Sequence, residues 1–147
     1  MLLLILIAAA LLSGCGEKPS SIADLNTRTV ILPNGARIEA EVKLTGPEMA
    51  RGMMFRDSLP KDRGMLFVHN PPGQYAYWMY QCKFPLDIIW MDSKRRIVEI
   101  AADSPPCRSK PADCPSYGGH RYAQFVLELG GGEAQRHGLR EGLALSF

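Results

Sequence analysis

Alternating apolar and polar residues predict a strand near the start of the chain. From Ile38 to Leu44 every second residue is apolar, and the residues between them are charged. A period of two is typical of a half-buried antiparallel strand, which we place at residues 36–44. The preceding apolar residues 29–32 and the turn Pro33-Asn34-Gly35 predict the other half of a β-hairpin.

Shorter patterns predict the remaining elements. Thr45 and Glu48 have the spacing of a capping box, which predicts a short helix ending near Met53. Glycines on both sides of residues 133–137 predict a second helix of one or two turns. Apolar runs separated by turn residues predict strands at residues 65–68, 75–79, 86–91, 96–101, 122–129 and 143–147. We therefore predict a mainly β fold, bordering on α+β: a small antiparallel barrel or a strongly curved sheet with two short helices.

The first residues have the pattern of a lipoprotein signal peptide. Residues 1–12 are all apolar, a run that as a helix reaches only about 18 Å, whereas a bilayer core is about 30 Å thick. The sequence Leu12-Ser13-Gly14-Cys15 resembles a lipobox. We therefore expect residues 1–14 to be a removed signal peptide and Cys15 to carry the lipid that anchors the protein to a membrane.

The anchor predicts where the rest of the chain is located. Residues 16–21 are polar and contain Pro and Ser, which is typical of a tether. We place the tether at residues 15–26 and expect residues 27–147 to form a single β-rich domain. We expect this domain outside the cytoplasm in the cell envelope. The residue after Cys15 is Gly16 and not the aspartate that resembles an inner-membrane retention signal. This favours the outer membrane in a bacterium with two membranes. The net charge is only +2, which argues against nucleic acid as a partner.

Several short motifs occur together in a characteristic order. They are Gly52-Met-Met-Phe-Arg56, Leu59-Pro60, Gly64-Met-Leu-Phe67, Tyr77-Trp-Met79, Pro85-Leu-Asp-Ile-Ile89, Pro106-Cys107 and Val126-Leu-Glu-Leu129. From Thr27 to Phe147 the chain resembles the prokaryotic family known as domain of unknown function 192. The resemblance implies a compact, β-rich, often exported module with no agreed activity. The chain differs from the family at Cys82, where threonine is more usual.

The cysteines of the exported domain should meet an oxidising environment. Cys107 and Cys114 lie in the longest stretch without a predicted strand, residues 103–120. We predict a disulfide between them, worth about 2.5 kcal/mol of unfolding free energy by the chain-entropy model. A zinc site that uses both cysteines and His120 is an alternative, although it lacks an obvious fourth ligand.

Two further residue types have alternative interpretations. Cys82 is expected to be a small buried side chain; as a nucleophile it would need a base among His69, His120 and His137. The methionines are expected to fill the core, but thioethers also bind Cu(I). They are Met49, Met53, Met54, Met65, Met79 and Met91.

Arg56 and Asp87 are lone charges among apolar neighbours. Because a buried charge needs a partner, we predict that they pair with each other. The pair either stabilises a loop or forms a ligand-binding site in a cleft that includes Trp78 and Tyr117.

These patterns favour one class of function over two others. We expect a non-catalytic envelope lipoprotein that binds a small ligand or an envelope protein, with no catalytic residue, cofactor or metal assigned. A hydrolase-like enzyme and copper handling by methionines are the alternatives. No nucleophile–base spacing or phosphate-binding loop is recognisable in the sequence.

Overall fold

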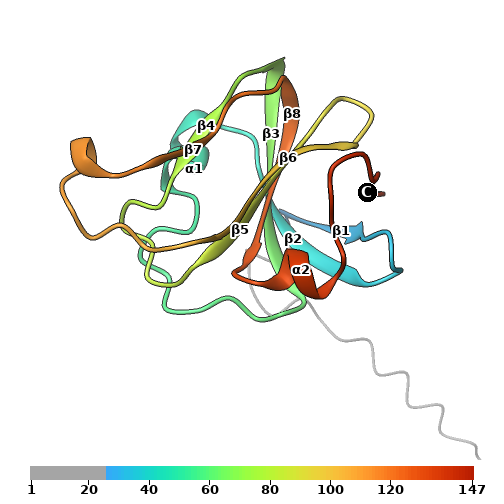
Figure 1. Cartoon of the computed structure of the whole chain (residues 1–147), viewed down its shortest axis with the longest axis horizontal. Helices are drawn as coiled ribbons and strands as arrows, with labels where there is room; N and C mark the ends of the chain where they lie inside the picture. The colour runs from blue at the N-terminus through green and yellow to red at the C-terminus, as the bar shows by residue number, and fades with distance from the viewer. Residues whose placement is uncertain (1–25) are drawn as a thin grey trace, which may run out of the picture.

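The computed structural model describes residues 26–147. A six-stranded sheet has the order β1-β2-β3-β8-β5-β6, and β4 and β7 form a separate pair (Figure 1). The large sheet is strongly curved, and its edge strands β1 and β6 do not pair, so the curved-sheet form of the prediction is confirmed and the barrel form is wrong.

The elements are β1 (Thr27–Ile31), β2 (Arg37–Lys43), α1 (Gly46–Arg51), β3 (Arg63–Gly73), β4 (Ala76–Trp78), β5 (Leu86–Met91), β6 (Ile97–Ser104), the 3-10 turn η2 (Pro111–Asp113), β7 (Ser116–Gly118), β8 (Ala123–Gly130) and α2 (Glu133–Arg136).

The N-terminal hairpin is confirmed, and a crossover follows it. β1 pairs with β2 in antiparallel fashion, with Val30 opposite Ile38. β2 then pairs with β3 in parallel fashion, a geometry that requires a connection across one face of the sheet. α1 lies in this connection, and its capping box is present, with the Glu48 carboxylate 3.0 Å from the Thr45 amide.

The sheet has a hydrophobic core on each face. Side chains alternate along β8, so that Val126 contributes to one core and Leu127 to the other. We call the first the α1-side core, because residues of α1 and of β4 pack against it. The second, the α2-side core, lies under β1, α2 and the C-terminal segment. Figure 1 shows the two helices at different sides of the curved sheet.

The β4–β7 pair packs closely on the α1-side core. Tyr77 lies opposite Tyr117 in this pair. The indole nitrogen of Trp90 on β5 donates a hydrogen bond to the Tyr75 carbonyl, at 2.8 Å. A Cβ atom on Gly118 would lie only 2.2 Å from the Trp90 ring, so β7 approaches the core as closely as a glycine allows.

The predicted disulfide is confirmed. Cys107 and Cys114 are bonded, with their Cα atoms 5.7 Å apart, and Cys82 is a free, buried cysteine. The stretch 103–120 was expected to lack strands, but it contains both η2 and β7.

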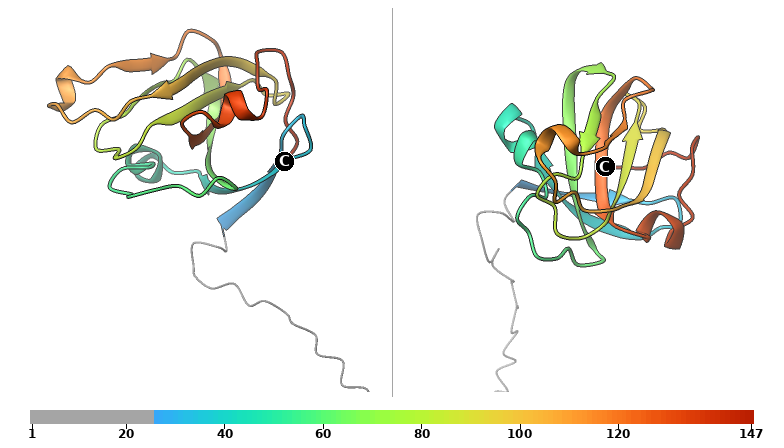
Figure 2. Two further views of the ribbon diagram at one scale, coloured as in Figure 1. Left: turned by 60° about the horizontal axis from the view of Figure 1, so that its bottom comes forward. Right: turned by 60° about the vertical axis from the view of Figure 1, so that its left-hand side comes forward.

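The chain ends beside its first strand instead of forming a regular strand of its own. The region 143–147 makes two isolated bridges, Ile31 with Ser146 and Arg96 with Ala144. The C-terminal residues therefore lie next to β1 (Figure 2). Within residues 26–147 no helix has the length and apolar character needed to cross a bilayer. The predicted signal peptide 1–14, the lipidation site Cys15 and the tether up to residue 25 lie outside the described residues.

Candidate functional site

A buried carboxyl group lies at the centre of the α1-side face. Glu128 is in β8 with 4% of its surface exposed. It lies opposite Met65 of β3 and Ile88 of β5, both of which are fully buried. The strand alternation therefore places one acidic side chain in a row of apolar ones.

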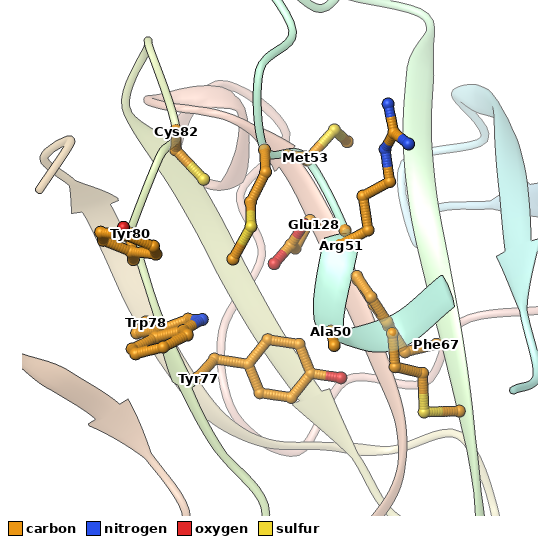
Figure 3. Close-up of a pocket in the computed structure, with 12 residues that line it drawn as sticks. Ala50, Arg51, Met53, Phe67, Tyr77, Trp78, Tyr80, Cys82 and Glu128 are labelled. Atoms are coloured by element: carbon orange, nitrogen blue, oxygen red, sulfur yellow. The ribbon is translucent and has the colours of Figure 1, made fainter. Parts of the chain in front are cut away.

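The Glu128 carboxyl group faces a small cavity. We call it the Glu128 pocket: residues 49–54 cover it, and Phe67, Tyr77, Trp78, Tyr80 and Cys82 line its walls. Figure 3 shows Glu128 pointing into the space between these side chains. The cavity volume is about 30 Å³, roughly the share of one water molecule in the liquid. One carboxyl oxygen, Oε2, is buried and has no hydrogen-bond partner within residues 26–147.

Burial determines the protonation of this carboxyl group. It raises the pKa of Glu128 to about 8, against the opposing effect of the Arg56 charge. Glu128 is therefore mostly protonated at neutral pH. A protonated carboxyl group both donates and accepts hydrogen bonds.

Cys82 lines the same pocket as a protonated thiol. Burial, together with the nearby Glu128, raises its pKa to about 12. A nucleophilic cysteine requires a thiolate, so the environment of Cys82 does not favour the nucleophile interpretation.

Each histidine proposed as a base for Cys82 has another partner. His69 Nε2 lies 2.9 Å from the Tyr77 hydroxyl, and burial lowers the pKa of His69. His120 pairs with Glu99 and His137 with Asn34. The zinc alternative is wrong, because Cys107 and Cys114 are consumed by the disulfide.

The predicted pairing of Arg56 with Asp87 is wrong. Arg56 makes a bidentate ion pair with Glu41, with distances of 2.5 and 2.7 Å. Asp87 is fully buried and accepts backbone N–H groups instead. Its donors are Asp103 at 2.7 Å, Gly132 at 3.2 Å and Ala134 at 2.5 Å. Both charges do have partners, as expected, but not each other.

The four predicted site residues are accordingly separated. Trp78 lines the Glu128 pocket, whereas Arg56 lines another surface depression with Glu41. Tyr117 lies on β7 and packs against the α1-side core without lining the pocket. Asp87 supports the start of α2. Of the four predicted site residues, Trp78 therefore lines the pocket and the other three do not. The pocket also contains Glu128, which the sequence analysis did not identify.

A wider groove adjoins the Glu128 pocket. It has a volume of about 190 Å³ and shares Met49, Ala50, Tyr77 and Trp78 with the pocket. Trp78 is 42% exposed, and its ring lies 5.2 Å from that of Tyr80. The buried acid is thus the inner end of a larger, aromatic recess along α1 and β4.

Comparisons with known proteins point to relatives without an assigned activity. The model of the family DUF192, described as "Uncharacterized ACR, COG1430", matches residues 29–147. A comparison with curated proteins gave no match.

Two solved structures are similar. A Novosphingobium aromaticivorans protein of unknown function is 34% identical, with a TM-score of 0.69, over 82% of this chain and 84% of that one. A proposed transcription regulator from Sinorhizobium meliloti is 25% identical, with a TM-score of 0.71, over 80% and 89% of the two chains.

Proposed function

We propose a ligand-binding role in the cell envelope for this chain, which belongs to the DUF192 family. In this role the protein is anchored through lipid on Cys15 and binds a small ligand in the Glu128 pocket without catalysing a reaction. Glu128 forms the polar contact, and the aromatic side chains of the recess enclose the ligand.

The single observation that carries this proposal is the unpaired oxygen of Glu128. A buried polar atom without a hydrogen bond costs about 1–3 kcal/mol of folding free energy. Buried polar groups without partners are rare, and each calls for an explanation. Glu128 lines the cavity, and its carboxyl group points into it (Figure 3), so a group bound there could supply the hydrogen bond that Oε2 lacks.

The surroundings of Glu128 favour binding over catalysis. Mainly apolar and aromatic walls with a few polar groups, here including Glu128 and Arg51, are typical of ligand pockets. A glycosidase needs two facing carboxyl groups, and Glu128 is the one carboxyl group among the described residues that line the pocket. The thiol of Cys82 is protonated, which leaves it a poor nucleophile.

The proposed anchor is supported by the N-terminal pattern and is compatible with the disulfide. Disulfides such as Cys107–Cys114 persist in oxidising compartments. Treating the native host with globomycin, which inhibits the lipoprotein signal peptidase, should leave an uncleaved precursor. Normal processing in the presence of globomycin would overturn the lipoprotein assignment.

The binding function is tested with the full chain extracted from the native envelope in mild detergent. Mass spectrometry of the small molecules and ions released on unfolding should show one component enriched with the wild type and reduced with Glu128→Gln. Glu141→Gln, at an exposed position, is the matched control and should retain that component. Identical profiles for the wild type and Glu128→Gln would overturn the proposed function.

A further inference from the structure

We propose that the ligand of the Glu128 pocket is a soft monovalent metal ion, Cu(I), bound by the sulfur atoms of Cys82 and Met53. This inference rests on the proposed function, because it names the class of ligand for the same pocket.

The size of the pocket restricts what can occupy it completely. A volume of about 30 Å³ accommodates one water-sized group. An organic molecule could insert only one end, whereas a bare metal ion fits entirely inside. The occupant that matches the whole cavity is therefore an ion or a water molecule, and the chemistry of the walls distinguishes between the two.

The walls of the pocket are rich in sulfur. Met53 is 2% exposed and Cys82 is 7% exposed; in Figure 3 both lie around the space into which Glu128 points. Met49 and Met54 also line the pocket and supply further thioethers. Thiolate and thioether ligands select Cu(I) over harder ions.

The charges balance when Cu(I) binds. The S–H bond of Cys82 breaks, a Cu–S bond forms, and the thiol proton is released to the solvent without any change of oxidation state. The positive ion and the new thiolate cancel, so binding adds no net charge to the pocket and avoids the cost of an isolated buried charge. Glu128 lines the same pocket, and a polar group beside the ligands of a metal ion can orient them.

Titration of the full chain with Cu(I) tests the inference. The protein in detergent, with its disulfide intact, is titrated anaerobically against a chromophoric Cu(I) chelator. We expect one bound Cu(I) per chain and sulfur in the copper coordination shell by X-ray absorption. Cys82→Ser and Met53→Leu should abolish this site, and Glu128→Gln should weaken Cu(I) affinity about tenfold.

The controls separate metal binding from loss of folding. Met91→Leu changes a fully buried methionine of the α2-side core and should leave Cu(I) affinity unchanged. Met53→Leu nearly conserves volume, so its thermal unfolding should resemble that of the wild type. Equal Cu(I) affinity in wild type and Met53→Leu, or tighter binding of Zn²⁺ than of Cu(I), would overturn the assignment.

The Glu128 carboxyl ¹³C signal distinguishes this inference from the proposed function. If Cu(I) leaves the signal unchanged but small molecules extracted from the native envelope shift it, the pocket binds a ligand and the copper assignment is wrong. If neither changes the signal, both the assignment and the proposed function are wrong.

Discussion

Two acidic residues within apolar strands have opposite environments. Asp87 accepts hydrogen bonds from three backbone N–H groups, so its carboxylate is satisfied by partners inside the fold. Glu128 has an oxygen with no partner among residues 26–147. The first arrangement stabilises the structure, and the second leaves a group available for binding.

Glu128 should make stability fall as pH rises. Its folded pKa of about 8 lies above the ordinary value of 4.5, so between these values the folded state keeps a proton that the unfolded chain has lost. Raising pH through this window favours unfolding, by at most about 1.4 kcal/mol per pH unit. Urea unfolding of the wild type should therefore give a lower free energy at pH 8 than at pH 5, and Glu128→Gln should remove this decline.

Glu141→Gln serves as the comparison, because this exposed residue should leave the decline intact. Parallel pH curves for the wild type and Glu128→Gln would show that the carboxyl group is not protonated in the folded state.

Asp87→Ala should cost about 3 kcal/mol or more of unfolding free energy. The change removes the acceptor of three N–H groups, of which that of Ala134 is buried, and an unpaired buried group costs about 1–3 kcal/mol; the emptied volume of the buried side chain adds to this loss. Chemical denaturation measures the loss. Asp92→Ala is the control, because Asp92 accepts N–H groups only in an exposed turn and should cost less. Equal losses in the two variants would contradict the structural role of Asp87.

Sequence reasoning predicts that a buried charge has a partner, but not which one. The donors to Asp87 are backbone groups distant in the sequence, which no side-chain pattern reveals. Glu128 carried the same signal, a single charge within Phe125-Val-Leu-Glu-Leu129. Its importance depends on the cavity beside it, which only the packing of α1 and β4 creates.

At the scale of elements, local patterns, including the β1–β2 hairpin, were predictive, whereas pairings between distant segments were not. The alternation in β2 and the capping box of α1 were visible in the sequence, because each depends on neighbouring residues. The short strand β7 was missed, since three residues show no periodicity. The parallel pairing of β2 with β3 depends on distant segments, so no local pattern indicated it.

The close contact between β7 and β5 should not tolerate a methyl group. Gly118 and Gly35 both have positive φ, at 65° and 84°, so alanine strains the backbone at either site. A Cβ at Gly118 would also lie 2.2 Å from the Trp90 ring, whereas nothing lies within 4 Å at Gly35. Thermal unfolding should therefore show a larger loss for Gly118→Ala than for Gly35→Ala, by about 1–3 kcal/mol for overpacking. Equal losses would mean that β7 moves away from Trp90 without cost.

At the scale of the whole molecule, the disulfide fixes the segment that leads into β7. Cys107 belongs to the α1-side core, and Cys114 packs against it. The bond therefore restrains one edge of the face that carries the Glu128 pocket.

Removing the disulfide should lower the unfolding free energy by about 2.5 kcal/mol by the chain-entropy model. The double variant Cys107→Ser with Cys114→Ser should show this loss in chemical denaturation. Adding a reductant should destabilise the wild type by a similar amount and leave the double variant unchanged. A reductant effect on the double variant would point to a different disulfide in solution.

The position of β8 determines when the chain can fold. β8 lies between β3 and β5 in the middle of the sheet, yet it comes near the end of the sequence. Pairings between distant segments form slowly, because a long loop must close first. Until residues 123–130 have been synthesised, the β1–β2–β3 half and the β5–β6 hairpin have no strand to join them. The six-stranded sheet therefore cannot be completed until residues 123–130 are available.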